Sequence, residues 1–323
     1  MKLRTSTMAI GIALTIAACG GSATPTTSGG PGKVASIASE VPSTVSGPIQ
    51  IATDATYAPN EFIDPNTGAI SGWDIDLGNA ICKVMGLVCT FNNVTFDDII
   101  AQLKASTPSE VAGGDKPRYS FSISSWSPTQ TREDNGIDFV TYYKAGEAWI
   151  VKVGGATINS AADMCGHTVA VESGTTEESD AWGYMGQSVG GTPIGGDKDN
   201  CPAGKDIKVL SFTTQTDANS ALLSGRADFG WLDQPVADFQ VKQSNGKLKI
   251  GGQPCSVAPY GIAMVKGSPL EKPITDAVKY LIDNNSYYTD ILKNWNVADG
   301  AITSADVALN NNNSIGATCV PSY

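Results

Sequence analysis

Residues 167–179, HTVAVESGTTEES, combine an apolar strand, a Gly-Thr turn and the start of a helix, a pattern that predicts an α/β unit. The chain continues in the same way beyond this stretch. DIKVLSF (206–212) predicts a strand, TQTDANSALLSG (214–225) a helix closed by Gly225, and RADFGWLD (226–233) another strand. The middle of the chain therefore predicts one α/β unit.

An earlier part of the chain predicts a second unit of similar build. PIQIATDATY (48–57) and YSFSIS (119–124) alternate apolar and polar residues, as strands do. Two segments between them predict helices, the second with Thr95 as its N-cap. Their apolar residues recur at helical spacing: Leu77, Ala80, Ile81, Val84 and Met85 in the first, Ile99, Ile100 and Leu103 in the second.

The end of the chain predicts helices that complete this earlier unit. Ser268, Pro269 and Glu271 form the pattern of an N-cap, a first helical residue and a capping box, and SYYTDILKNWNV (286–297) predicts a shorter helix.

Two apolar, extended segments, 144–154 and 257–267, flank the middle unit. We therefore expect two α/β lobes joined by two hinge strands, with residues 145–261 inserted into a lobe made of residues 48–144 plus 262–323.

The first residues predict an export signal with a lipid attachment site. Lys2 and Arg4 precede an apolar run too short to span a bilayer. The run ends in TIAAC (15–19), which resembles a bacterial lipobox, so we expect residues 1–19 to be the signal and Cys19 to anchor the protein outside the cell membrane. A signal peptide cut near alanine is the alternative. Residues 20–47 are rich in Gly, Ser, Thr, Pro and Ala, which predicts a flexible tether.

The net charge of -11 argues against nucleic-acid binding, because such binding requires a basic surface. Six cysteines besides Cys19 suggest three disulfides in an exported chain, although about fifteen pairings are possible. Spacing favours Cys82 with Cys89. Cys165 and Cys201 bracket one segment, which leaves Cys255 with Cys319. Zinc is the alternative, but the chain lacks a CxxC pair and has one histidine, so we expect no metal site.

Several segments, taken in order, resemble the extracytoplasmic solute-binding proteins of ABC importers, family 3, which bind polar amino acids. The segments are TDATYAPNEF (53–62), GWDIDLGNAICKVMG (72–86), SISSWSPTQTREDNGIDFVTYY (122–143), VAVESGTTEE (169–178), LLSGRADFGWLD (222–233), PYGIAMVKGSPL (259–270) and ILKNWNVADGAIT (291–303). The resemblance covers about residues 48–303 and implies a periplasmic-binding-protein-like type II fold. The Cys82–Cys89 spacing also resembles a disulfide of some members.

The chemistry of residues 122–133 supports this resemblance. A free amino acid requires partners for a carboxylate and an ammonium group, and the arginine fork binds a carboxylate with two parallel hydrogen bonds. Pro128 predicts that a helix begins directly after Ser127, where free N–H groups favour an anion. Arg132 and the serines would then form a carboxylate cradle. A solvated surface arginine is the alternative.

The resemblance implies nine ligand-binding residues. Arg132, Ser125 and Ser127 correspond to residues that contact the ligand carboxylate and ammonium group, and Asp233 corresponds to the ammonium-binding acid. Thr176 corresponds to a hydroxyl donor of the other lobe. Tyr57 and Phe96 correspond to two residues that sandwich the ligand side chain, and Asp54 and Glu172 to positions near the end of that side chain. Without the resemblance, Thr176 would be a helix cap, Asp233 a solvated turn residue and Phe96 a core residue.

Asp54, Glu172 and the nearby Glu177 would place three carboxylates at the side-chain end of the site. Burying three carboxylates costs free energy unless the ligand supplies hydrogen-bond donors to them. We therefore expect a ligand with a basic or amide side chain, as in arginine, lysine, histidine or glutamine. The chain departs from the family pattern in its longer loop 106–118 and in Asn60, which replaces an apolar residue.

The resemblance implies capture by closure of the two lobes and delivery to an ABC permease by a monomer without a cofactor. We expect no enzyme, because no Ser-His-Asp or Cys-His set is evident. Two alternatives remain: an amino-acid-sensing lipoprotein partner of a signalling system, and a dehydratase-like enzyme with Glu172 as its general acid or base.

Overall fold

The computed structural model describes residues 30–45, 47–105, 118–195 and 199–321, and residues 31–323 form one compact unit. The expected signal with Cys19 and nearly all of the loop 106–118 lie outside the described residues. Within these ranges, no helix has the length and apolar character needed to cross a membrane.

A single eight-stranded sheet runs through the fold, in the order β11-β8-β12-β7-β13-β6-β1-β5. The short strands pair in parallel, whereas β7 and β13 run antiparallel to their neighbours. The strands are β1 (Pro48–Thr53), β5 (Val88–Asn93), β6 (Phe121–Trp126), β7 (Ile137–Lys152), β8 (Thr168–Glu172), β11 (Lys208–Phe212), β12 (Phe229–Asp233) and β13 (Leu248–Val265). The expected mixed α/β class is confirmed.

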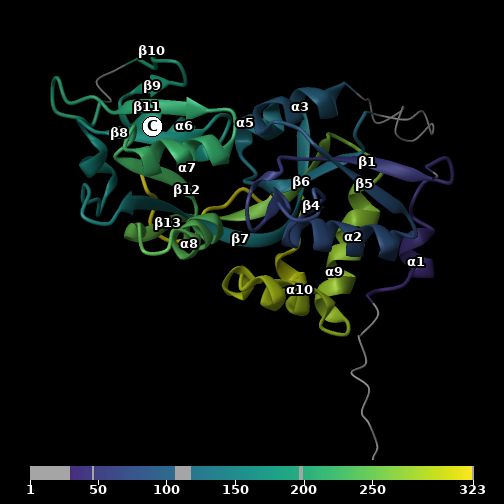
Figure 1. The fold of residues 1–323 in the computed structure, drawn as a ribbon. Helices are drawn as coiled ribbons and strands as arrows, with labels where there is room; N and C mark the ends of the chain where they lie inside the picture. Colours follow the sequence, from purple (N-terminus) through teal and green to yellow (C-terminus); the bar gives the residue numbers. More distant parts are fainter. Residues whose placement is uncertain (1–29, 46, 106–117, 196–198, 322–323) are drawn as a thin grey trace, which may run out of the picture. The chain divides into compact units, whose positions relative to one another are not determined.

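Helices cover both faces of each half of this sheet (Figure 1). We call the part built around β1, β5 and β6 lobe 1; its helices are α1 (Ala35–Ala38), α2 (Trp73–Met85), α3 (Phe96–Lys104), α5 (Gln130–Asp134), α9 (Glu271–Asp283) and α10 (Tyr287–Trp295). Lobe 2 surrounds β8, β11 and β12 and contains α6 (Thr176–Tyr184), α7 (Gln215–Ser224) and α8 (Gln234–Gln243). The remaining short elements are β2 (Thr56–Tyr57), β3 (Glu61–Ile63), β4 (Ile70–Ser71), β9 (Gln187–Ser188), β10 (Thr192–Pro193), η1 (Ala161–Met164), η2 (Ala298–Gly300) and η3 (Ser304–Asp306).

Helix α2 shows how the sequence builds the core of lobe 1. Trp73, Leu77, Ile81 and Val84 recur at helical spacing and are fully buried, and each such side chain contributes about 1.5–3 kcal/mol when it leaves water. Gly86 ends the helix in the left-handed conformation, at φ 75°, which glycine adopts without steric cost. The helix therefore begins and ends where the sequence favours it.

Strands β7 and β13 connect the lobes and pair with each other along most of their length. Their register is regular for residues 248–251, 258–260 and 261–265, but it shifts around Cys255 and again between Tyr260 and Gly261. Register shifts of this kind bend and twist a strand pair. The segment 252–261 therefore contains the irregular parts of the connection between the lobes.

The C-terminal segment 304–321, here called the C-terminal strap, runs along β7 and β13 and contacts both lobes. In lobe 1 the backbone N–H of Asn310 donates to the carbonyl oxygen of Phe139 at 2.8 Å. Farther along, Ile315 bridges to Val257, and Val320 packs in the core of lobe 2. The end of the strap thus lies against lobe 2, although its residues belong to the range 262–323 expected for lobe 1.

Three disulfides are present, Cys82–Cys89, Cys165–Cys201 and Cys255–Cys319. The pair favoured by spacing, Cys82–Cys89, is confirmed. The other two bonds join Cys165 to Cys201, which bracket one segment, and the remaining Cys255 to Cys319. Cys255–Cys319 joins the strap to β13, so the strap is covalently attached at its lobe 2 end.

Two expected helix starts were wrong. Helix α9 begins at Glu271 rather than at Pro269, because the N–H of Glu271 is bonded to the carbonyl oxygen of Ser268 in a preceding turn. Helix α5 begins at Gln130 rather than directly after Ser127. Thr129 is extended and caps α5 by accepting from the N–H of Arg132, so α5 is a five-residue helix without the anion-binding start that we expected.

The first folded residues also differ from the expectation of a tether through residue 47. Residues 35–38 form α1, and Ile37 is buried in the core of lobe 1. The N–H of Val34 donates to the carbonyl oxygen of Val84 at 2.9 Å. Residues 34–38 therefore pack on α2 instead of forming part of a tether.

Candidate functional site

A pocket lies between the two lobes, and the space outside protein atoms within it amounts to about 320 Å³, part of which is open to solvent. All nine residues expected to bind ligand line it, together with Glu177. The lining residues are Asp54, Tyr57, Glu61, Phe96, Ser124, Ser125, Ser127, Arg132, Glu172, Thr175, Thr176, Glu177 and Asp233. The structure thus brings together residues that are separated by up to 179 positions in the chain.

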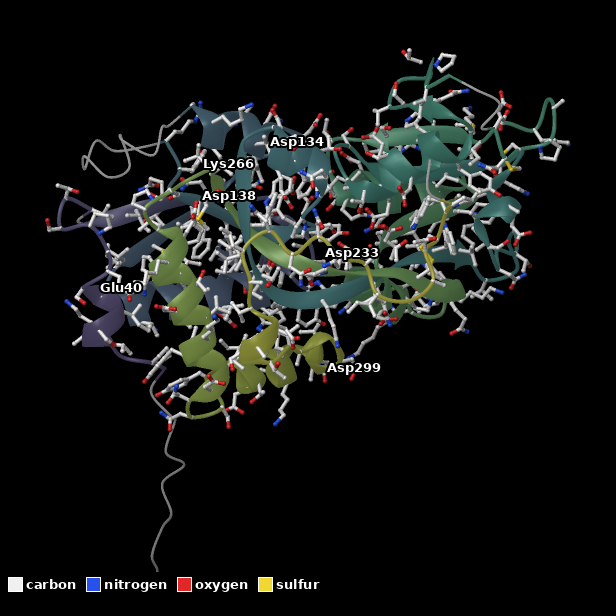
Figure 2. All side chains as sticks on the ribbon, turned by 180° about the vertical axis from the view of Figure 1, so that it is seen from behind. Glu40, Asp134, Asp138, Asp233, Lys266 and Asp299 are labelled. Carbon is white, nitrogen blue, oxygen red and sulfur yellow. A yellow bond between two sulfur atoms is a disulfide. The ribbon has the colours of Figure 1, made fainter. Side chains whose placement is uncertain are left out.

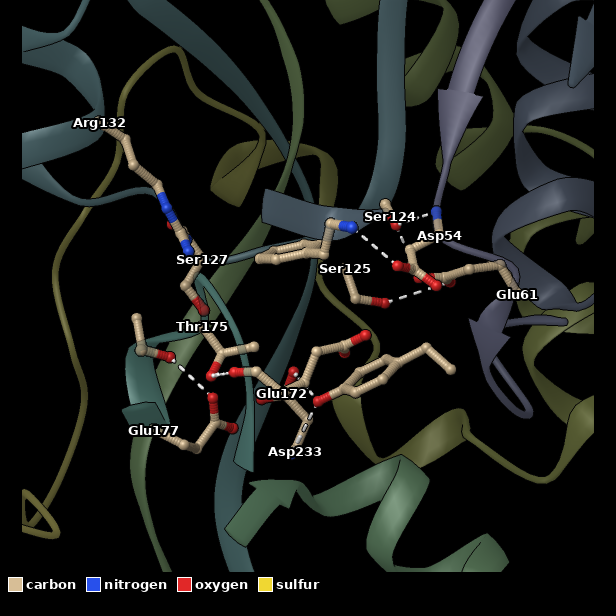
Figure 3. A pocket seen from close by; sticks show the side chains of 13 residues that line it. Asp54, Glu61, Ser124, Ser125, Ser127, Arg132, Glu172, Thr175, Glu177 and Asp233 are labelled. Atoms are coloured by element: carbon tan, nitrogen blue, oxygen red, sulfur yellow. Dashed lines mark hydrogen bonds between the residues drawn. The ribbon is translucent and has the colours of Figure 1, made fainter. Parts of the chain in front are cut away.

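The cationic side chain among the described lining residues lies at one end of the pocket (Figure 3). Arg132 and Ser127 lie on one side, and Asp54 and Glu61 lie on the opposite side. Asp233, labelled in Figure 2, is the last residue of β12, which pairs with the long strand β7 in the middle of the sheet. The pocket therefore has hydrogen-bond donors of lobe 1 at one end and the carboxylates of Asp54 and Glu61 at the other, and the acids of lobe 2 line it as well.

The guanidinium of Arg132 is held in place by both lobes. Its Nη1 donates to the carbonyl oxygen of Ser127 at 2.6 Å, and its Nη2 donates to that of Gly174 in lobe 2 at 2.8 Å. The same group lies over the rings of Trp126 and Phe96, 4.8 and 5.6 Å from their centres, where cation–π attraction adds to its fixation. Burial lowers the pKa of Arg132 to about 10, so the side chain stays cationic near neutral pH.

Asp54 is bound to the backbone on the opposite side of the pocket. Its Oδ1 accepts from the N–H and hydroxyl of Thr56, at 3.0 and 2.7 Å, and its Oδ2 accepts from the N–H of Phe96 at 2.7 Å. Burial raises the pKa of Asp54, while these donors oppose the shift. This carboxylate fixes the start of α3 and hence the position of the Phe96 ring.

The lobes contact each other directly across the pocket. The hydroxyl of Tyr57 in lobe 1 donates to Asp233 Oδ2 in lobe 2 at 3.0 Å, and it accepts from the N–H of Asp233 at 3.0 Å. The Oγ1 of Thr56, whose proton is donated to Asp54, also lies 3.3 Å from Glu172 Oε1 in lobe 2. Together with the bond from Arg132 to Gly174, these contacts connect β2 and α5 to the carboxyl ends of β8 and β12.

Carboxylates in lobe 2 crowd the pocket. Burial raises the pKa of Asp233 to about 7, although Tyr260, Tyr57 and the charge of Arg132 oppose the shift. Burial and the charge of Asp233 raise the pKa of Glu177 to about 8. Burial also raises the pKa of Glu172 well above its usual range. Glu172 and Glu177 are both only 2 % exposed, so neither faces solvent.

Three lining residues were missed by the sequence analysis: Glu61, Ser124 and Thr175. Each is next to, or near, a residue that was selected. Ser124 and Ser125 both reach the pocket because Ser125 has a φ of 51°, in the left-handed region, which breaks the alternation of a strand. The serines at positions 122, 124 and 125 were the signal for Ser124.

A comparison with family models matches residues 49–298 to the bacterial extracellular solute-binding proteins, family 3. Among characterised relatives, an arginine-binding protein of Corynebacterium glutamicum is 29% identical over 77% of this chain and 74% of its own length. A glutamine-binding protein of an ABC transporter of Bacillus subtilis is 26% identical over 74% of this chain and 77% of its own length.

Solved structures with the same fold include an ancestral arginine-binding protein bound to arginine, with a TM-score of 0.64 and 31% identity over 78% of this chain and 99% of that one. An ancestral amino-acid-binding protein described as a precursor of cyclohexadienyl dehydratase gives a TM-score of 0.63 and 27% identity over 77% of this chain and 95% of that one. The fold is therefore that of the type II periplasmic binding proteins.

Proposed function

Because the chain belongs to the bacterial extracellular solute-binding proteins of family 3, we propose that it binds a free amino acid with a basic or amide side chain, arginine before glutamine, between its two lobes. The ligand-bound protein would then deliver this cargo to an ABC permease in the membrane. The relatives named for arginine and glutamine support this range of ligands.

The balance of charge in the pocket carries the proposal. Its described lining residues include five carboxyl groups, Asp54, Glu61, Glu172, Glu177 and Asp233, against one cationic side chain, Arg132. A buried charge needs a partner. Arginine contributes two cationic groups and one carboxylate, so it would satisfy Arg132 and also place positive charge beside the acids.

The position of Arg132 sets the orientation of the ligand. Its carboxylate would lie at the end formed by Arg132, Ser127 and Thr176, since the guanidinium retains donors beyond the two used on backbone carbonyls. Its ammonium group would lie at Asp233. The side chain would then extend between the rings of Tyr57 and Phe96 toward Glu172 and Asp54.

Closure of the two lobes and attachment to the membrane would involve the chain as a whole. Residues 48–144 plus 262–323 and residues 145–261 would be the two lobes that close on the ligand, because a ligand that contacts both of them stabilises their contact. Cys19 would carry the lipid that holds a monomeric protein at the outer face of the membrane.

Isothermal titration calorimetry of the purified protein against the twenty amino acids tests the ligand class. We expect L-arginine to bind most tightly, with L-glutamine or L-lysine next and L-glutamate without measurable heat. Mass spectrometry of ligands that co-purify gives an independent reading. Tight binding of glutamate with no response to arginine would reject the proposed side-chain class.

A further inference from the structure

The hydrogen-bond direction of the Ser125 hydroxyl is set by a chain of residues that starts outside the pocket, at Trp73. An indole N–H can only donate, and that of Trp73 donates to Asn60 Oδ1 at 2.7 Å. Because this bond occupies the amide oxygen, the amide nitrogen of Asn60 faces Ser125 and donates to its Oγ at 2.8 Å. Ser125 therefore accepts a hydrogen bond from Asn60.

The proton of the Ser125 hydroxyl is directed away from the pocket centre, to a pair of acids. Asp74 Oδ2 lies 3.3 Å and Glu61 Oε2 lies 3.4 Å from Ser125 Oγ, and both acids are fully buried. The backbone N–H of Ser125 is also used, since it donates to Asp74 Oδ2 at 2.9 Å. A hydroxyl has one donor and two acceptor positions, so one acceptor position of Ser125 remains for a ligand.

Ser124 is oriented in the same way. Its Oγ accepts from the N–H of Asp54 at 2.9 Å and donates to Glu61 Oε1 at 3.0 Å. Its proton is therefore also used within the protein. Both serines line the pocket, and each presents an acceptor there rather than a donor.

We propose that Asn60 is a positioning residue that, with Glu61 and Asp74, presets Ser125 as an acceptor for an N–H group of the bound amino acid. This inference rests on the proposed function and assigns Ser125 to the ammonium group, leaving the ligand carboxylate to Arg132 and its neighbours. An apolar residue at position 60 lacks both the acceptor for Trp73 and the donor for Ser125.

A double-mutant cycle on the affinity for L-arginine tests this role, since two residues that act through each other give non-additive effects. The cycle combines Asn60→Leu with Ser125→Ala, and calorimetry measures the dissociation constant of each variant. The matched control combines Asn60→Leu with Ser127→Ala, because Ser127 lines the same pocket without a hydrogen bond to Asn60. Thermal melting of each variant reports its stability separately.

We expect Asn60→Leu to weaken arginine binding about tenfold in the parent and in the Ser127→Ala background, but less than about threefold in the Ser125→Ala background. An equal loss in all three backgrounds overturns the inference, because a general structural defect acts independently of Ser125. If the leucine variant does not fold, Asn60→Ala provides the same cycle with a smaller side chain. If the parent binds no amino acid, the proposed function and this inference both fail. If the parent binds arginine but the losses in all three backgrounds are equal, only this inference fails.

Discussion

Arg132 is poised to bind a carboxylate because its position is fixed before any ligand arrives. Two of its N–H groups are bonded to backbone carbonyls of different lobes, and its planar face lies over Trp126. A side chain held in this way loses little conformational freedom when it binds. Lysine could not reproduce the arrangement, because it lacks the planar fork.

We predict that Arg132→Ala weakens L-arginine binding by about 3 kcal/mol or more, because the ligand carboxylate loses its buried partner. Calorimetry measures the change. Arg226→Ala is the matched control, since Arg226 is an exposed arginine that lies over the ring of Phe212 outside the pocket. Parent-like affinity of Arg132→Ala would place the ligand carboxylate elsewhere.

Glu177 is the acid whose replacement tests ligand charge most directly. Its Oε1 has no hydrogen-bond partner among the described residues, and its side chain lines the pocket. We predict that Glu177→Gln weakens L-arginine binding about tenfold, as expected for a lost buried charge partner, and L-glutamine binding much less. Competition titrations measure the ratio of the two affinities.

Glu178→Gln provides the control for Glu177→Gln. Glu178 is also buried but bonds to the N–H of Gly174 and the hydroxyl of Ser211 instead of lining the pocket. Its replacement should lower stability and leave the arginine-to-glutamine ratio unchanged. Equal ratios in both variants would contradict a role for Glu177 in selectivity.

Among the elements, the C-terminal strap contacts both lobes and is attached by one disulfide. Removing that disulfide with Cys255→Ser and Cys319→Ser should lower the free energy of unfolding by about 2–4 kcal/mol, because the bond closes a long loop. Hydrogen exchange should also show loss of protection in residues 307–321, since their end is no longer attached to β13.

The disulfide Cys165–Cys201 serves as the comparison for the strap, because it lies within lobe 2 and closes a loop of 36 positions rather than 64. Cys165→Ser with Cys201→Ser should lower stability while protection of residues 307–321 is retained. Loss of protection there in both double variants would mean that the strap depends on lobe 2 folding rather than on its own bond.

Local patterns predicted the elements that have strong periodicity and clear ends. Helix α2 follows its apolar spacing, and α7 ends at Gly225 in the left-handed conformation, as expected. Strand β5 was missed because it is an edge strand whose residues are exposed or half-buried. The path of the strap depends on pairing with β7 and β13, and such distant contacts leave no local pattern.

The family resemblance identified most of the expected ligand-binding residues, because its motifs match these positions of the chain. The chemistry of carboxylate binding supported Arg132 independently, but it could not show which neighbouring side chains face the pocket. That choice depends on backbone conformation, such as the positive φ of Ser125. It also depends on distant partners, since Asn60 and Trp73 determine the direction of the Ser125 hydroxyl.

The buried acids link stability and ligand binding of the whole molecule to pH. The pKa values of Asp74 and Asp233 are raised to about 7 and that of Glu177 to about 8, so the folded protein binds more protons than the unfolded chain between about pH 4 and 8. Stability should therefore fall as pH rises through this window. Melting temperatures of the protein without added ligand should be higher at pH 5 than at pH 8.

Affinity for a cationic ligand should change in the opposite direction. Ionised acids attract the ligand and protonated ones do not, so arginine binding should strengthen from pH 5 to pH 8 and release protons. Calorimetry in buffers with different heats of ionisation counts these protons, and Glu177→Gln should reduce their number. Binding that is independent of both pH and buffer would show that the acids keep their protonation state on binding.

The position of Arg132 over Trp126 gives the molecule an intrinsic optical reporter. A carboxylate arriving at the guanidinium would partly cancel the positive field at the indole ring, which shifts the emission of a tryptophan. Loading could then be followed in real time without any label, and a phenylalanine at position 126 would identify the fluorophore.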